Sequence, residues 1–211
     1  MYLTRTYLNA RRRGAQKLLG SPQAMHAAVL AGFPPGVEPG RPLWRVDADD
    51  ELRPALYVLS EQAPDLAHLE EQAGWPSHPT TQATSYQPLL EALDAGQTWA
   101  FRLTANPTHR AEINGVSKVL GHVTVTQQVG WLLSRQTALG ISLGEEDEPS
   151  FTLTGREVRR FRRSESAVTL STARFEGVLK VVDPALLRVA LTQGIGRAKA
   201  YGCGLMTLAK P

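Results

Sequence analysis

The pattern of apolar and polar residues in the first part of the chain predicts a strand followed by a helix. Tyr2 to Asn9 alternates and is rich in β-forming residues, which is typical of a half-buried strand. Ser21-Pro22 supplies a serine N-cap followed by proline at the first helical position. Apolar side chains then recur at helical spacing, at Met25, Val29 and Phe33. The sequence Pro-Pro-Gly at residues 34–36 ends the predicted helix.

The next segment predicts two strands and a second helix. Leu43 to Val46 and Ala55 to Ser60 are strand-like and flank the acidic turn Asp47 to Glu51. Asp65 to Ala73 predicts a helix after a proline, and Gly74 to Gln87 is a stretch of low hydrophobicity with strand character. The order is therefore strand, helix, strand, strand, helix, followed by a weakly marked strand.

The second half of the chain repeats this order. Trp99 to Ala105 and Val119 to Thr126 predict strands, and an apolar stripe predicts a helix over Gln127 to Ala138. Three further elements and a final strand follow: strands over Phe151 to Arg160 and Val168 to Val182, a helix over Pro184 to Gln193, and a strand over Leu205 to Ala209. At 211 residues the chain is long enough for two domains. We therefore predict an α+β fold of two tandem ferredoxin-like (RRM-like) domains, residues 1–90 and 97–211.

The net charge of +3 hides a strong segregation of charge along the chain. Residues 41–97 carry three cations against ten anions, whereas residues 150–211 carry eleven cations against four anions. This distribution is typical of a protein that turns one basic face toward a polyanion. We therefore expect the C-terminal part to bind a nucleic-acid backbone.

Cysteine, histidine and apolar content exclude several classes of protein. The single cysteine, Cys203, excludes an internal disulfide and a cysteine-built zinc site, and we expect it to be a packing residue. No pair of histidines has ligand spacing, so we expect no metal and no other cofactor. No run of eighteen apolar residues and no signal-peptide core occur. We therefore expect a cytoplasmic protein that does not enter membranes.

A glycine-rich loop near the C-terminus has the composition of a phosphate-contacting segment. Glycines at four positions bracket two cations: Gly194, Gly196, Arg197, Lys199, Gly202 and Gly204. Glycine allows close approach of backbone N–H groups and positive φ, and the cations neutralise phosphate. The helix precedes the glycines and the strand follows them, which excludes a dinucleotide fingerprint. Taken alone, the loop is explained equally well as a set of tight turns.

An arginine-rich segment precedes the loop. Five of eight residues are arginine: Arg156, Arg159, Arg160, Arg162 and Arg163. On a strand these arginines point to both faces, so we expect a protruding hairpin. It serves either as a solvated edge that prevents sheet aggregation or as an arm that docks on the phosphates of an RNA duplex.

The chain as a whole resembles the CasE family of CRISPR repeat-RNA endoribonucleases, which belong to type I-E systems. The resemblance rests on residues 194–209 and on three shorter motifs: Met1-Tyr2-Leu3-Thr4, residues 101–107 and Phe175-Glu176-Gly177-Val178-Leu179. It implies two ferredoxin-like domains, recognition of a hairpin in the CRISPR precursor RNA, and a place among the subunits of the Cascade complex.

Of the five histidines, His26 stands out. It lies one turn inside the capped helix, beside the apolar stripe and after the basic segment that includes Lys17. The resemblance places a catalytic histidine in the pair Met25-His26. The chain departs from the family around it, because Gln23, Ala27, Ala28 and Ala31 replace a tyrosine and basic residues. Lys17, Arg11 to Arg13 or a residue of the other domain must then supply positive charge.

RNA carries its own nucleophile, the 2′-hydroxyl, so cleavage needs proton transfer and charge stabilisation but no metal. We therefore predict a metal-independent endoribonuclease that leaves a 2′,3′-cyclic phosphate and stays bound to its product. The alternative is an RNA-binding scaffold subunit with little or no cleavage activity. Both hypotheses account for the basic tail, and only His26 distinguishes them.

Overall fold

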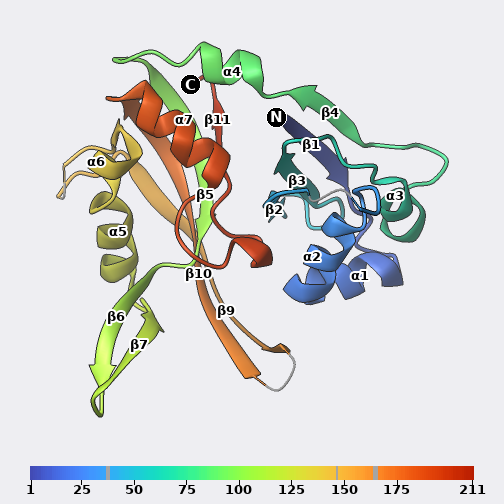
Figure 1. The fold of residues 1–211 in the computed structure, drawn as a ribbon, viewed down its shortest axis with the longest axis horizontal. Helices are drawn as coiled ribbons and strands as arrows, with labels where there is room; N and C mark the ends of the chain where they lie inside the picture. The colour runs from blue at the N-terminus through green and yellow to red at the C-terminus, as the bar shows by residue number, and fades with distance from the viewer. Residues whose placement is uncertain (37–38, 146, 164–165) are drawn as a thin grey trace. The chain divides into compact units, whose positions relative to one another are not determined.

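The structure, a computed structural model, describes residues 1–36, 39–145, 147–163 and 166–211, without the side chains of residues 162, 163, 166 and 167. The chain divides into two compact units (Figure 1). The first comprises Met1–Glu91 and Lys199–Gly202, and the second comprises Ala92–Ala198 and Cys203–Pro211. The prediction that residues 97–211 form one continuous domain therefore differs from the structure at Lys199–Gly202, which pack with the first unit.

The first unit has the ferredoxin-like sheet that the sequence predicts. Its strands are β1 (Tyr2–Tyr7), β2 (Leu43–Asp47), β3 (Ala55–Ser60) and β4 (Gln82–Ser85). They pair in the order β2-β3-β1-β4, and every pairing is antiparallel. The central strand β1 lies between β3 and β4, as the β-α-β-β-α-β connection requires.

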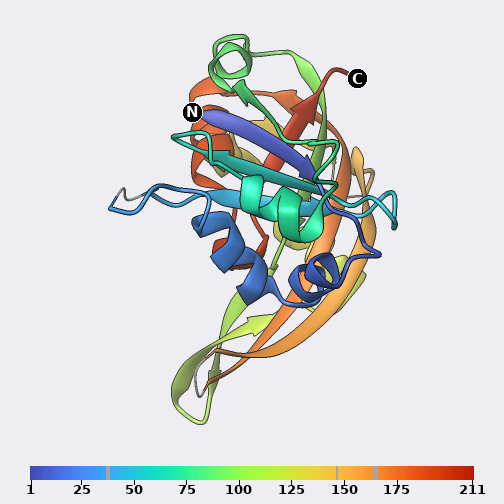
Figure 2. The same ribbon diagram turned by 90° about the vertical axis from the view of Figure 1, so that its right-hand side faces the viewer.

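Three helices lie on one face of this sheet (Figure 2). They are α1 (Arg13–Gly20), α2 (Pro22–Leu30) and α3 (Ala67–Ala73), and a short helix, α4 (Gln87–Glu91), follows β4. Met25 and Val29 of α2 join Leu56 and Val58 of β3 in the core beneath them. The apolar stripe that predicts α2 is thus the side of the helix that packs on the sheet.

The second unit repeats the topology around a longer sheet. Its strands are β5 (Thr98–Ala105), β8 (Ile141–Ser142), β9 (Phe151–Arg163), β10 (Ser166–Val181) and β11 (Met206–Ala209). The order is β11-β5-β10-β8, and β9 also pairs with β10, with a register shift between Arg174 and Phe175. The two tandem ferredoxin-like domains predicted from the sequence are confirmed.

Helices and one inserted hairpin complete the second unit. The helices are α5 (Val125–Leu133), α6 (Gln136–Leu139) and α7 (Pro184–Gln193), and β6 (Thr108–Ile113) pairs with β7 (Val116–Gly121). The β6–β7 and β9–β10 hairpins both extend from the body of this unit (Figure 1). Within the described part of the chain, every helix is too short or too polar to cross a bilayer.

Two predictions near residue 120 are wrong. The strand predicted over Val119 to Thr126 ends at Gly121, because Thr124 instead caps α5. Its hydroxyl accepts a hydrogen bond from the backbone N–H of Gln127, and the Gln127 side chain accepts from the N–H of Thr124. This capping box starts the helix at Val125 rather than at Gln127. The predicted helix over Gln127 to Ala138 is in fact two helices, α5 and α6.

Candidate nucleic-acid interface

His26 lies on α2 in the first unit, and the predicted cap positions that helix. The Ser21 hydroxyl accepts a hydrogen bond of 3.2 Å from the Ala24 N–H, and Pro22 is the first helical residue. Met25 is buried in the core, whereas His26 is half-buried and its neighbour Gln23 is exposed. The imidazole is therefore held by a rigid, capped helix and is partly open to solvent.

Helix α2 supplies no lysine or arginine of its own around His26. The helix has no basic residue in its last turn. His68 of α3 has its Nε2 atom 2.9 Å from the carbonyl oxygen of Ala28, so that histidine anchors α2 rather than adding a second imidazole to the surface. Any cation near His26 therefore comes from another element.

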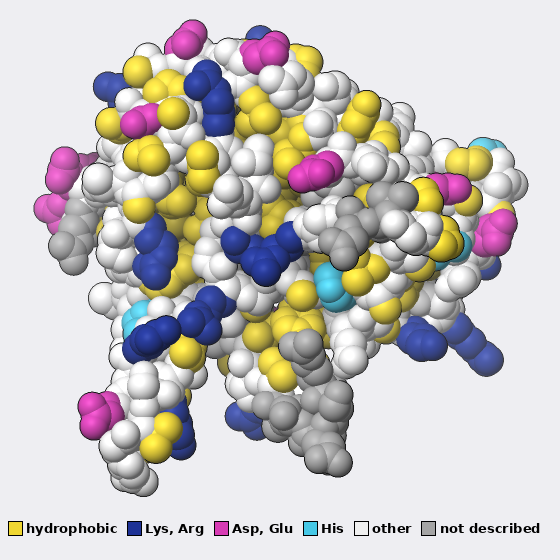
Figure 3. Space-filling view, in the orientation of Figure 1, with side chains coloured by type: hydrophobic (Ala, Val, Ile, Leu, Met, Phe, Trp, Pro, Cys, Tyr) yellow, Lys and Arg dark blue, Asp and Glu magenta, His cyan; other side chains and the backbone are white. Residues whose placement is uncertain are grey.

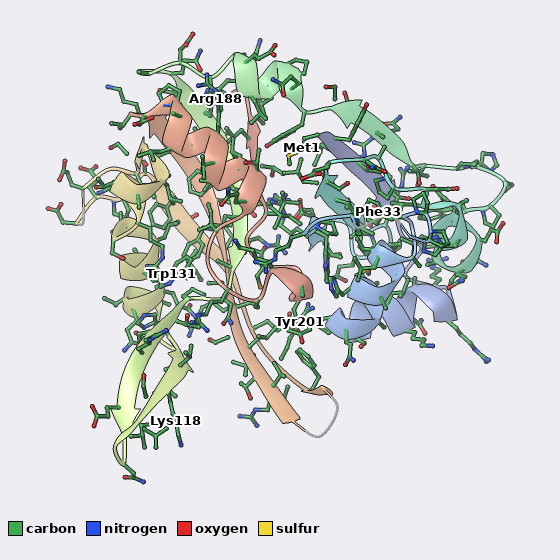
Figure 4. The ribbon with its side chains drawn as sticks, in the orientation of Figure 1. Met1, Phe33, Lys118, Trp131, Arg188 and Tyr201 are labelled. Atoms are coloured by element: carbon green, nitrogen blue, oxygen red, sulfur yellow. The ribbon has the colours of Figure 1, made fainter. Side chains whose placement is uncertain are left out.

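A short 3₁₀ helix, η1 (Lys199–Tyr201), packs against α2 and β2 within the first unit. Figure 4 shows Tyr201 at this turn. The Lys199 side chain is half-buried, and burial, together with the nearby charge of Arg41, lowers its pKa. A cation that is partly removed from water and lies next to another cation is well suited to hold an anion. The glycine-rich loop thus brings the turn that contains Lys199 against the helix that carries His26.

The four glycines of the loop all have the conformation for which glycine is suited. Their φ values are +75° at Gly194, +78° at Gly196, +81° at Gly202 and +91° at Gly204. Two of their N–H groups are already bonded inside the protein, since Gly194 donates to Ala190 and Gly204 donates to Thr104. These two glycines therefore shape the loop. The expectation that their N–H groups contact a ligand is wrong, because both groups are hydrogen-bonded within the protein.

The remaining two glycines lie against tryptophan rings. A Cβ atom at Gly202 would lie 2.7 Å from Cζ3 of Trp44, and a Cβ at Gly196 would lie 3.0 Å from Cζ2 of Trp131. Gly202 is buried, whereas Gly196 and Arg197 are exposed. Gly202 therefore has a structural role in packing, whereas Gly196 and Arg197 are exposed and remain predicted RNA contacts.

The predicted arginine arm is the β9–β10 hairpin, and its arginines differ in their surroundings. Arg156 donates from Nε to Oε1 of Gln128 at 3.0 Å and from Nη2 to the Val123 carbonyl. Arg159 pairs with Glu157 at 2.7 Å. Arg160 is exposed. The side chains of Arg162 and Arg163 lie outside the described residues.

The basic residues before α2 also divide into two kinds. The Arg12 guanidinium donates to the Gly74 carbonyl at 3.1 Å, which ties the start of α1 to the end of α3. Arg11, Arg13 and Lys17 are exposed. Lys17 therefore keeps its place among the candidate RNA-binding residues, whereas Arg12 has a structural role.

A groove of about 570 Å³ in the second unit brings together residues that the sequence analysis missed. We call it the histidine groove, and its lining includes His109, Arg110, His122, Trp131, Arg135 and Arg197. Figure 3 shows basic side chains beside a histidine where the β6–β7 hairpin leaves this unit. Of these residues only Arg197 was a candidate. The sequence signal for this groove was the placement of His109 and His122 at the two ends of the β6–β7 hairpin. The signal was missed because β6 was not predicted.

The described residues hold no group of three or more histidine, cysteine, aspartate or glutamate side chains that could bind a metal ion. Cys203 is fully buried, and burial raises the pKa of its thiol to about 12. This cysteine is a packing residue, as the sequence predicts.

Comparison with known proteins adds three findings to this geometry. A family model described as CRISPR associated protein matches residues 1–210. The CRISPR-associated endoribonuclease Cse3 of Thermus thermophilus is 32% identical over 219 residues, which cover 99% of this chain and 100% of that protein. The Cascade subunit CasE of Escherichia coli K12 is 32% identical over 181 residues, 79% of this chain and 88% of that protein.

A solved structure agrees with the sequence comparison. Thermus thermophilus Cse3 bound to an RNA that represents a pre-cleavage complex superimposes with a TM-score of 0.82 at 29% identity. The match covers 99% of this chain and 98% of that one. The likeness therefore extends over both units.

Proposed function

This chain belongs to the CRISPR-associated protein family, and we propose that it cleaves CRISPR precursor RNA at the repeat hairpin. The proposal extends to this chain what the names of its relatives state: an endoribonuclease, a pre-cleavage RNA complex and a Cascade subunit. We further propose that it works in the cytoplasm as a subunit of a Cascade complex and stays bound to its product.

The single observation that carries the mechanism is the packing of η1 against α2. It brings the Lys199 turn to the helix that bears His26, although α2 itself carries no cation in its last turn. A cation near the imidazole is what 2′-hydroxyl chemistry requires when no metal is used. We propose that Lys199, with Arg41 nearby, takes the place of the basic residues that are alanine in this α2.

The reaction follows from these two groups. The neutral imidazole of His26 accepts the proton of the 2′-hydroxyl, and the 2′-oxygen forms a bond to the adjacent phosphorus. The bond from phosphorus to the 5′-oxygen breaks, and the imidazolium returns a proton to that oxygen. Lys199 stabilises the extra negative charge of the pentavalent phosphorus. The products are a 2′,3′-cyclic phosphate and a 5′-hydroxyl.

Binding is assigned to other residues. We propose that Arg160, Arg197 and Lys17 contact phosphates of the RNA, since all three are exposed and basic. Arg159 joins them if the RNA displaces its Glu157 partner, and Arg162 and Arg163 extend the same arm. Arg156 supports the hairpin from within, because Gln128 and Val123 occupy its guanidinium.

The test is cleavage of repeat hairpin RNA by the pure protein in EDTA, with analysis of the product ends. The proposal predicts one cut per hairpin, a 2′,3′-cyclic phosphate, and no cut in an all-deoxy hairpin of the same sequence. Tight binding of the RNA with no cleavage under any condition would instead support the scaffold function.

A further inference from the structure

The histidine groove is lined by positive charge. Three arginines line it, Arg110, Arg135 and Arg197, and within the described part of the chain no aspartate or glutamate is among its lining residues. Unmatched cations in a concave surface are typical of a site for an anion.

Arg135 shows how this charge is held in place. Its Nη1 atom donates to the Trp131 carbonyl at 2.7 Å and to the Ser134 hydroxyl at 3.2 Å. Its guanidinium carbon lies 4.2 Å from the centre of the Trp131 ring, and Figure 4 shows this tryptophan on α5. Burial lowers the pKa of Arg135, so this cation is partly desolvated, and the described residues that line the groove with it include no carboxylate. A bound anion would offset that cost.

Two histidine rings form the other wall of the groove. The ring centres of His109 and His122 are 4.6 Å apart, and their planes are inclined by 31°. His122 is fixed by its backbone: its N–H donates to Pro107 at 2.9 Å, and its carbonyl accepts from Ser171 at 2.8 Å. His109 is exposed. The pair therefore presents a flat ring that a ligand can reach.

We infer that the histidine groove binds one unpaired nucleotide of the RNA, with its phosphate on the arginines and its base stacked on His109. The inference rests on the proposed function and adds a site for RNA outside the hairpin stem. Flat rings beside unmatched cations are the usual features of single-strand recognition, because only an unpaired base can turn its face to a side chain. About 570 Å³ is within the range of small-ligand sites.

The groove also makes the binding sensitive to pH. Burial, then His109, then Arg135 lower the pKa of His122, which favours the neutral form of its ring. The charged groups around it are Arg110 on β6, Arg135 after α5 and Arg197 on the loop, and the uncharged Gln127 and Ser134 lie on α5 and at its C-cap. Because all three charges are positive, protonation of His122 adds to the attraction for phosphate. The affinity gain should therefore rise as the pH falls below the ordinary histidine range.

The experiment compares equilibrium binding of three repeat hairpin RNAs: one that ends at the stem, one with a short unpaired 5′ extension and one with a short unpaired 3′ extension. The protein carries His26→Ala, so that cleavage does not disturb the measurement. One of the extensions should tighten binding by roughly 10-fold, the size of one base-stacking contact with its phosphate. His109→Ala and Arg110→Ala should each remove most of that gain. Lys180→Ala, which removes an exposed cation from β10 of the same unit, should leave the gain intact.

The inference is overturned if the affinity gain persists in His109→Ala and Arg110→Ala, or if neither extension increases the affinity. Neither result bears on hairpin binding or cleavage. If no hairpin is bound at all, the proposed function fails, and a second measurement still tests the groove. A short unpaired oligoribonucleotide should then shift the side-chain NMR signals of His109 and His122, with little effect on His78. Absence of those shifts, or the same shifts produced by polyglutamate and not by RNA, would overturn the inference.

Discussion

Substitution of Gly202 by alanine tests whether the packing of η1 depends on this glycine. The residue has φ +81° and is buried, and a Cβ would lie 2.7, 3.1 and 3.2 Å from three atoms of the Trp44 ring. Trp44 is only 2% exposed, so a displaced ring would have to move within the packed core. Alanine at this position must therefore strain the backbone, displace the ring or release the turn.

The expected loss of stability has two parts. The left-handed conformation costs alanine about 1–2 kcal/mol. Overpacking against the Trp44 ring adds about 1–3 kcal/mol. Gly96→Ala is the matched control, because Gly96 has φ +88° and no atom lies within 4 Å of its added Cβ. The control should lose only the about 1–2 kcal/mol of unfolding free energy that the left-handed backbone costs.

Chemical denaturation followed by circular dichroism gives the two free energies of unfolding, and single-turnover cleavage under native conditions gives the functional effect. Gly202→Ala should be less stable than Gly96→Ala by about 1–3 kcal/mol and should cut RNA more slowly, since Lys199 leaves α2 with the turn. Equal stability of the two variants would refute the packing argument. Reduced stability with normal cleavage would show that the position of η1 does not matter to the chemistry.

Three further predictions concern single residues. Lys199→Ala should slow cleavage by about 10²-fold with the fold intact, the effect of removing one charge-stabilising donor, and an unchanged single-turnover rate would exclude that role. Arg160→Ala should lower the slope of log affinity against log salt by about one unit, whereas Arg156→Ala should change it less, and the reverse order in salt titrations would contradict the assignment. Glu70→Gln should destabilise the first unit at neutral pH. Burial opposes ionisation of Glu70, but hydrogen bonds from Thr81, Thr80 and Thr6 outweigh it and hold its pKa below the usual range. The ionised carboxylate therefore stabilises the fold above the ordinary glutamate pKa, and the difference between wild type and variant should shrink as the pH falls through the lowered value. A difference that grows in acid would refute this.

The elements with strong local signals could be predicted from the sequence. The serine cap and the apolar stripe determine α2, and the hydrogen bond from Ala24 to Ser21 confirms the predicted start. Pro184–Gln193 is the predicted helix, with Asp183 as its cap. In both helices the signal lies in adjacent residues, which is why sequence alone suffices.

Elements without a clear apolar face were missed. Helix α1 buries only Ala15 and Leu18, so its pattern over Arg13–Gly20 is too short to recognise. Strand β6 has exposed or half-exposed side chains throughout, so no alternation of buried and exposed positions marks it. The β4 strand, which the sequence predicts only as a weakly marked strand, is exposed too, and it is anchored just before its start, where Glu70 accepts hydrogen bonds from Thr80 and Thr81.

The candidate sites also differ in whether their residues are close together in the sequence. His26 could be found because its helix is locally encoded. The histidine groove could not, because His109, His122, Arg135 and Arg197 come from a hairpin, a helix end and a loop that only the fold of the second unit brings together. Likewise, the packing of η1 against α2 joins residues far apart in the sequence.

The most direct test of the central claim is the single-turnover rate of hairpin RNA cleavage in EDTA, measured for wild type, His26→Ala and His78→Ala. His78 is an exposed histidine of the same unit and serves as the control. Wild type and His78→Ala should cut at the same rate, and His26→Ala should be slower by at least ~10²-fold with unchanged hairpin affinity. Full activity in His26→Ala, or loss of wild-type cleavage when EDTA is added, would contradict it.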